Sequence, residues 1–303
     1  MRDSKMRRFW PAILRRLGMA RWLNYNHALT VSGRTFLIPV QGGLGENLLK
    51  LTPDFKSEII RLFGERLPDC FVDIGANLGQ TIIDAFSVRS WGRYIALEPN
   101  PVAFAYLESL VKANHLPVER LPWAAGAEAS PHNFCSQGTA DPAATMAPQG
   151  RPGVYSPGMS QWVATYPLDL LIDLAALPSG VLMKIDVEGF EADVLAGATR
   201  ILRDIRPVIL CEILRAYVEP SIAFTNERMS KVEKILADQR YRIFYIEMEN
   251  ETSGRIRALR EISSFPRGLW KDNPTGMDYL FVPAEMALPA FTGSGGLSLV
   301  REA

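Results

Sequence analysis

The stretch FVDIGANLGQ, from Phe71 to Gln80, decides the fold, because a short apolar run here turns directly into a helical pattern. The apolar run ends at Ile74, and the helical spacing after it is carried by Leu78, Ile82, Ile83 and Phe86. Gly75 allows a tight turn and a close approach between the backbone and a ligand, while Gly79 lets the helix start pack near the strand. The stretch therefore predicts a strand, a ligand-binding turn and a helix.

This turn has the position of a nucleotide-binding loop but lacks the residues that bind pyrophosphate. Asn77 occupies the middle position, where the fingerprint GxGxxG requires glycine, and the P-loop pattern GxxxxGK[ST] is absent. Asp73 stands at the end of the strand, where a carboxylate repels phosphate and suits the ammonium group of a methionine moiety, directly or through water. The expected ligand is therefore cationic and free of phosphate.

Outward from this stretch, apolar runs alternate with helical patterns, which is typical of βαβ units. Asn100 is a good N-cap and Pro101 a good first helical residue, so one helix start is well marked. Both strands and helices are apolar enough for burial on two faces. We predict an α/β fold with a seven-stranded, mostly parallel Rossmann-like sheet and helices on both faces. The expected strands are 70–74, 94–97, 118–125, 181–187, 208–213, 241–247 and 278–282.

The chain also divides into segments of different composition. Residues 1–30 form a basic amphipathic N-terminal segment, with seven Lys and Arg against one Asp. It reads either as a helix packed on the domain or a partner subunit, or as a piece lying on an anionic membrane surface. Residues 31–66 form a small, hairpin-like cap region. The other segments are the main domain at 67–286, its insertions near 130–161 and 250–275, and a flexible tail at 287–303.

Composition excludes several classes of protein. With 33 basic and 33 acidic residues among 303, no overall field recruits nucleic acid. Three cysteines without a CxxC and three histidines without ligand spacing predict no disulfide framework and no metal site of Cys or His. No apolar run approaches the roughly 18 residues of a membrane span. We expect a cytoplasmic protein. Residues 1–30 are the segment that would contact a membrane surface.

Glu98 ends the strand that follows Asp73, 25 residues further along the chain. An acid at about this spacing accepts hydrogen bonds from the hydroxyls of a ribose. No arginine follows to receive a 2′-phosphate. The pair of acids on adjacent strands therefore indicates a plain adenosine.

The run from Lys184 to Glu188 places ionisable side chains at every second position of an otherwise apolar strand, so Lys184, Asp186 and Glu188 share one face. Buried charges at the carboxyl end of a central strand cost several kcal/mol unless they pair or meet a ligand. Glu212, at the end of the next strand, points into the same crevice. These four residues are the candidate catalytic group.

These motifs resemble those of the FkbM-type methyltransferases, a branch of the class I enzymes that use S-adenosyl-L-methionine. The resemblance is carried by DIGANLGQ at 73–80, LEPNP at 97–101, PLDLL at 167–171, KIDVEGFE at 184–191 and RPVILCEI at 206–213. It implies methyl transfer, usually to a hydroxyl oxygen of a sugar, a polyketide or another small molecule. It also implies which residues bind the cofactor. At the methionine end these are Asp73, Gly75 and Asn77, to which the turn adds Gly79. Glu98 would hold the ribose, Asn100 would lie beside the adenosine, and Trp123 and Ala124 would lie near the adenine.

For such a transfer the enzyme must align the acceptor oxygen, the methyl carbon and the sulfur and remove the hydroxyl proton. We expect Asp186 to orient or deprotonate the acceptor and Lys184 and Glu188 to fix its position or acidity. Glu212 is the second candidate base. A divalent cation held by Asp186 and Glu212 is an open alternative, although their spacing does not demand one.

Two functions from other classes compete with this interpretation. A nicotinamide-dependent oxidoreductase would share the fold and Glu98, but it needs glycine at position 77 and a Tyr and Lys pair that we do not find. A catalytically silent relative would serve as a cofactor-bound interaction module. The partner expected for the enzyme is a small-molecule hydroxyl acceptor, and a homo-oligomer is compatible with the sequence.

Overall fold

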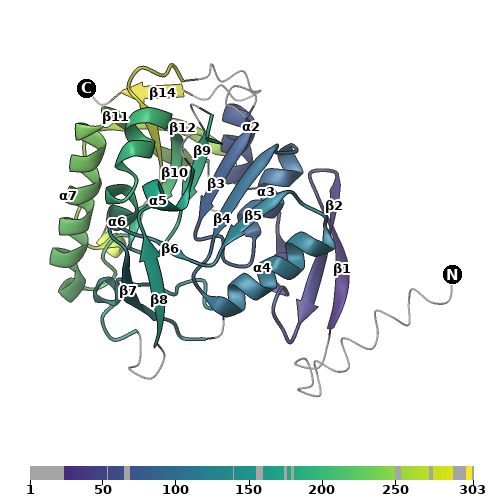
Figure 1. Cartoon of the computed structure of the whole chain (residues 1–303). Coiled ribbons are helices and arrows are strands. Elements are labelled where there is room, and N and C mark those ends of the chain that lie inside the picture. The colour runs from purple at the N-terminus through teal and green to yellow at the C-terminus, as the bar shows by residue number, and fades with distance from the viewer. Residues whose placement is uncertain are drawn as a thin grey trace, which may run out of the picture.

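The chain begins, within the described part, with a β-hairpin that packs beside the main domain (Figure 1). Strands β1 (Asn24–Val31) and β2 (Arg34–Gln41) pair antiparallel around a tight turn in which Ser32 and Gly33 both have positive φ. The hairpin is confirmed, but residues 24–30 had been assigned to the amphipathic segment and are strand, with side chains alternating in exposure. The rest of that segment lies outside the described residues. The computed structural model describes residues 24–52, 54–64, 69–138, 140–154, 160–173, 176–178, 181–249, 254–272, 276–288 and 298–301.

A mixed, mostly parallel sheet of nine strands forms the centre of the molecule, in the order β14-β12-β11-β13-β10-β9-β3-β4-β5. All seven expected strands are in it, and neighbours from β10 to β5 are parallel, whereas β13 runs antiparallel to β10 and β11. The α/β prediction is therefore confirmed. The bounds are β3 (Cys70–Ile74), β4 (Arg93–Leu97), β5 (Val118–Leu121), β9 (Leu182–Ile185), β10 (Val208–Glu212), β11 (Tyr241–Met248), β12 (Ile256–Ile262), β13 (Asp278–Pro283) and β14 (Ser298–Arg301).

Two of these strands were not expected, so the sheet has nine strands and not seven. Strand β12 lies in the stretch interpreted as an insertion and pairs with β11, and β14 lies in the stretch interpreted as a flexible tail and pairs with β12. Strand β12 lies near the edge of the sheet, where charged side chains are common, so it mixes charged and apolar residues. In the sequence such a mixture resembles a charged loop, which is why the strand was not predicted.

Helices cover both faces of the sheet, as predicted (Figure 1). Alternate side chains of β3 enter opposite cores: Phe71 packs with α2, α3 and α4, and Val72 packs with α5, α6 and α7. The helices are α2 (Phe55–Gly64), α3 (Gln80–Val88), α4 (Pro101–Ala113), α5 (Leu168–Leu171), α6 (Glu191–Ala196) and α7 (Ile222–Asp238). Shorter helical turns are η2 (Asn47–Lys50), η3 (Pro148–Gly150), η5 (Ile201–Ile205), η6 (Glu219–Ser221) and η7 (Trp270–Asp272).

A separate three-stranded sheet stands beside the carboxyl ends of the central strands. It consists of β6 (Ala124–Ala125), β8 (Ser160–Tyr166) and β7 (Ser130–Cys135), in that order. The stretch 118–125 was predicted as one strand, but the chain leaves the central sheet after Leu121. Pro122 has no amide hydrogen with which to continue the ladder. Part of the predicted insertion thus forms a second sheet.

Among the described residues, no helix combines the length and the apolar character needed to cross a membrane.

Candidate active site

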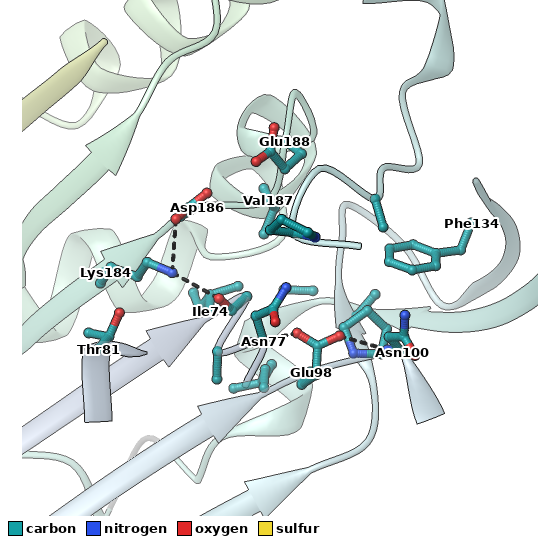
Figure 2. Close-up of a pocket in the computed structure, with 18 of the residues that line it drawn as sticks. Ile74, Asn77, Thr81, Glu98, Asn100, Phe134, Lys184, Asp186, Val187 and Glu188 are labelled. Carbon is teal, nitrogen blue, oxygen red and sulfur yellow. Dashed lines mark hydrogen bonds and ion pairs between the residues drawn. The ribbon is translucent and has the colours of Figure 1, made fainter. Parts of the chain in front are cut away.

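A cavity opens at the carboxyl ends of β3, β4 and β9, the edge where the sequence placed its polar residues (Figure 2). Of the residues predicted to bind the cofactor, the cavity is lined by Gly75, Asn77, Glu98, Asn100, Trp123 and Ala124. Of the candidate catalytic residues it is lined by Lys184, Asp186 and Glu188, whereas Glu212, which was expected to point into the same crevice, does not line it. Parallel strands bring these together because their carboxyl ends meet at one edge of the sheet.

Glu98 is held rigidly in the wall of the cavity. Its Oε2 accepts a 2.8 Å hydrogen bond from the amide of Asn77, and its Oε1 accepts a 2.7 Å bond from the amide of Asn100. The side chain is buried, and burial raises its pKa to about 7 although both amide bonds favour the charged form. A carboxylate oxygen can accept more than one hydrogen bond, so Glu98 retains capacity for ligand hydroxyls.

The two asparagines of the site shape the backbone. Asn77 has a φ of 46°, and its Oδ1 accepts a 2.7 Å bond from the amide of Leu78. Asn100 is the N-cap of α4, with Oδ1 accepting from the amides of Val102 at 3.0 Å and Ala103 at 3.3 Å. Both side chains therefore fix the loops that present their amides to Glu98.

Asp73 does not line the cavity, contrary to what its position at a strand end suggested. Its carboxylate is fully buried, accepts a 3.0 Å hydrogen bond from Tyr94 Oη, and has Lys184 Nζ 3.5 Å from its Oδ1. Asp73 and Lys184 are direct partners in the register of β3 and β9. The Asp73 carboxylate is therefore the counter-ion of Lys184 beneath the cavity, and direct contact with a methionine ammonium is not part of its geometry.

The two glycines of the turn have different roles. Gly75 has a φ of +80°, and a Cβ there would lie 2.0 Å from the carbonyl oxygen of Asp186, so the close approach is made by the protein's own backbone. Gly79 has a φ of +92° and does not line the cavity; a Cβ there would lie 2.6 Å from Leu110 Cδ2. Gly79 thus permits packing between helices α3 and α4.

Lys184 is the central cation of the site. It is 4 % exposed, and its ammonium donates a 2.8 Å hydrogen bond to the carbonyl of Gly75 and lies 3.3 Å from Asp186 Oδ2 (Figure 2). The charges of Asp186 and Asp73 raise its pKa, although burial alone would lower it. Lys184 therefore stays charged and ties β9 to the turn after β3.

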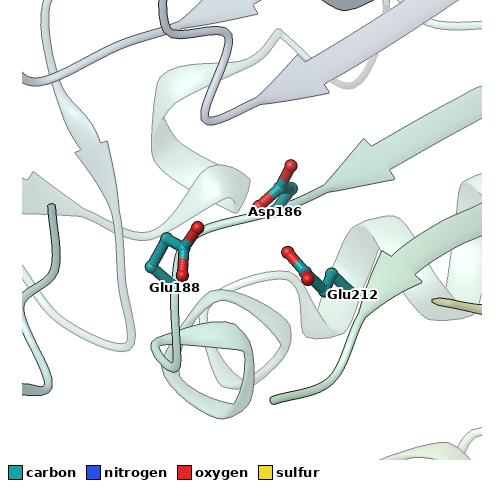
Figure 3. Close-up of side chains that lie close together, drawn as sticks. All are labelled: Asp186, Glu188 and Glu212. Atoms are coloured by element: carbon teal, nitrogen blue, oxygen red, sulfur yellow. The ribbon is translucent and has the colours of Figure 1, made fainter. Parts of the chain in front are cut away.

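Three carboxyl groups converge beside this lysine, from Asp186, Glu188 and Glu212 (Figure 3). One oxygen of each lies within 4.8 Å of the others. Glu188 is paired with Arg151 of the insertion, whose Nη2 lies 2.5 Å from Oε2. Asp278, the first residue of β13, is the register partner of Glu212 and adds a fourth carboxyl group that the sequence analysis missed.

The members of this cluster titrate differently. Burial and the charges of Asp186, Asp278 and Glu188 raise the pKa of Glu212 to about 10. Burial also acts on Asp186, but the ammonium of Lys184 and a hydrogen bond with Glu212 outweigh it and lower its pKa. At neutral pH the pair therefore holds one proton, on Glu212, and Asp186 is the charged member.

Residues 73–243 match the family described as the methyltransferase FkbM domain, which is more than half of the chain. The chain belongs to the FkbM methyltransferase family. Family membership implies S-adenosylmethionine as the methyl donor. The residues fit this cofactor, because the cavity offers an anchored carboxylate for hydroxyl groups and a carboxylate of lowered pKa for a cation.

Solved structures of methyltransferases are similar to this FkbM-family chain. The methyltransferase FkbM of Methylobacillus flagellatus KT is 15 % identical over 71 % of this chain and 44 % of its own, with a TM-score of 0.43. The chain thus spans less than half of that protein. The O-methyltransferase of Bacillus cereus, in complex with S-adenosylhomocysteine, is 14 % identical over 75 % of this chain and 77 % of its own, with a TM-score of 0.41. No curated protein matches the chain.

Several lining residues of this FkbM-family site escaped the sequence analysis. Lys56 comes from α2, in the region expected to be only a cap. Others come from the insertion and lie on the side of Trp123 and Ala124, namely Phe134, Asp141, Pro142, Ala144 and Met146. No motif marks these residues; the signal that could have found them is the position of the insertion directly after the third parallel strand.

Proposed function

We propose that the chain transfers a methyl group from S-adenosylmethionine to a hydroxyl oxygen of a small molecule, with sugars and polyketides as the first classes to test. The observation that carries the proposal is the joint placement of Glu98 and Asp186 on the wall of one cavity. The cofactor supplies a methyl group on a positively charged sulfonium. The cavity holds no phosphate-binding glycine loop, and Asn77 occupies the place of the glycine that a dinucleotide requires.

Asp186 is the proposed base. Its lowered pKa keeps it charged at neutral pH, and an ionised carboxylate within reach of the acceptor can orient the hydroxyl and take its proton as the oxygen attacks. Glu212 holds the proton of the pair and donates a hydrogen bond to Asp186, while Lys184 fixes the direction of the carboxylate. Glu188 is turned toward Arg151, so its proposed part is to hold the insertion at the site.

Part of the charge of this cluster is balanced within the protein. Lys184 and Arg151 each pair with a carboxylate, Glu212 carries a proton, and Asp278 adds a fourth carboxyl group beside Glu212. A divalent cation would have to displace these partners in order to gain its oxygen ligands. We therefore propose that the proton-sharing pair, and not a metal, activates the acceptor.

The test has two stages. S-adenosylhomocysteine, and not NAD, should raise the melting temperature of the protein, because a ligand that binds only the folded state stabilises it. Methyl transfer from radiolabelled S-adenosylmethionine should then be followed with a panel of hydroxyl acceptors, with Asp186→Asn as the control. Binding without transfer to any acceptor would favour the catalytically silent module, and stabilisation by NAD alone would favour an oxidoreductase.

We also propose that the enzyme works in the cytoplasm. Cys70, Cys135 and Cys211 are all buried free thiols, which suits a reducing compartment. Contact with a membrane surface through the basic segment at residues 1–30, and self-association, remain proposals from composition. Flotation with anionic vesicles and light scattering would test them.

A further inference from the structure

Lys56 is a cation that reaches the cavity from outside the family's domain. It lies near the start of α2, whereas the match to the family begins at residue 73. Of the described residues that line the cavity, only Lys56 and Lys184 are cationic. The ammonium of Lys184 is buried and already contacts Gly75, Asp73 and Asp186. Lys56 is the more accessible of the two, with a side chain 26 % exposed.

Asp54 holds Lys56 in place at the start of α2. Asp54 Oδ1 accepts a 2.9 Å hydrogen bond from the backbone amide of Lys56, and its Oδ2 accepts a 2.9 Å bond from the ammonium. One aspartate thus caps the helix and holds the side chain in place. An ammonium has three donors, so the bond to Asp54 leaves capacity for a ligand.

The surroundings of Lys56 keep it charged. Burial alone would lower its pKa, but the charges of Asp54, Asp278 and Asp186 raise it above its ordinary value. The positive charges of Lys56 and Lys184 also interact with each other. Lys56 is therefore a stable positive charge in the wall of the cavity, which Gln80 and Thr81, the first residues of α3, also line.

S-adenosylmethionine and its product both end in an amino acid, whose α-carboxylate needs a cation or amide donors when it leaves water. We propose that Lys56 binds this α-carboxylate, and that the helix preceding the family domain thereby completes the cofactor site. The inference rests on the proposed function, since it concerns the same ligand. It assigns a role to a residue that no motif of the sequence marks.

The experiment compares two ligands that differ by one group: S-adenosylhomocysteine and decarboxylated S-adenosylhomocysteine. Calorimetry should show that the wild-type protein binds the first at least tenfold more tightly, which is the usual size of a charge-assisted contact. In Lys56→Met this preference should fall to within about twofold, with little change for the decarboxylated ligand. Lys50→Met, which removes an exposed lysine of the same region that does not line the cavity, should keep the full preference.

A second variant guards against loss of folding in Lys56→Met. Asp54→Asn keeps an oxygen to cap α2 but removes the charge that competes for the ammonium, so it should increase the preference for the carboxylate severalfold. The inference is wrong if Lys56→Met retains the wild-type preference, if the wild-type protein shows none, or if Asp54→Asn leaves it unchanged. Failure of the proposed function looks different, because the wild-type protein would then bind neither ligand.

Discussion

The ammonium of Lys184 lies 3.3 Å from Asp186 Oδ2 and connects this carboxylate to the turn that follows β3. Lys184 lies in β9 and Asp186 directly follows its last residue, Ile185, so the two side chains meet at the carboxyl end of the strand. Beneath them the same ammonium is 3.5 Å from Asp73. The orientation of the proposed base therefore depends on a buried ion pair that belongs to the core of the sheet.

Removing this lysine should destabilise the protein strongly. In Lys184→Met the carboxylates of Asp73 and Asp186 lose their buried counter-ion, and such a loss costs about 3–5 kcal/mol. Urea unfolding followed by circular dichroism measures the free energy of unfolding. The double variant Asp73→Asn with Lys184→Met should recover part of the loss, because one stranded charge is then gone. Strict additivity of the two losses would show that the pair is not coupled.

Replacing the proposed base should affect the chemical step and spare cofactor binding. Asp186→Asn cannot accept the hydroxyl proton, so kcat should fall by about 10²–10⁴-fold. The dissociation constant of S-adenosylhomocysteine should change by less than about threefold, as measured by calorimetry. Glu212→Gln should be milder, because Glu212 already carries the proton at neutral pH. A larger loss of kcat in Glu212→Gln than in Asp186→Asn would mean that Glu212 is the base and Asp186 its partner.

Glu98→Gln should weaken the binding of the cofactor product. Both carboxylate oxygens accept backbone amides, but the amide nitrogen of glutamine cannot accept, so one amide loses its partner. We expect at least tenfold weaker binding of S-adenosylhomocysteine and a loss of about 1–3 kcal/mol in the free energy of unfolding. Glu119→Gln is the matched control, since Glu119 pairs with Arg93 on the exposed surface. Equal affinities of Glu98→Gln and Glu119→Gln for S-adenosylhomocysteine would show that Glu98 does not contribute to cofactor binding.

The ligand-free protein should become more stable as the pH falls from about 7.5 to 5.5. Burial raises the pKa of Glu98, Glu188 and Glu191 to about 7 in the folded state, above the ordinary value of 4.5. Between those values the folded protein binds more protons than the unfolded chain, so its stability falls as the pH rises. Urea unfolding at several pH values measures this slope, and Glu191→Gln should reduce it. A free energy of unfolding that rises between pH 5.5 and 7.5 contradicts the assignment.

Chelation should leave the methyl-transfer rate unchanged. Dialysis of the enzyme against EDTA removes any divalent cation, while the cluster of Asp186, Glu188 and Glu212 keeps Lys184, Arg151 and one proton as partners. The measurement is the initial rate before and after dialysis. Loss of activity that Mg²⁺ restores would mean that the carboxylates are ligands of a metal.

The sequence predicted which residues gather at one edge of the sheet where they follow from strand ends. Asp186 directly follows β9 and Glu212 ends β10, and parallel neighbours place such residues side by side. Glu98 was predicted on the same ground. The burial of Asp73 was not predicted, because it depends on Tyr94 and Lys184, which adjacent strands place around it. The spacing of residues along the chain does not specify the register in which two strands pair.

By itself the sequence determined the seven central strands and the edge at which the polar residues gather, because apolar runs and strand ends are local properties of the chain. Only the tertiary structure decided that Lys56 of α2, Asp278 of β13 and Arg151 of the insertion meet the acidic cluster. These residues are distant in sequence and carry no motif. Their positions follow from the packing of helices and the pairing of strands, which only the folded chain specifies.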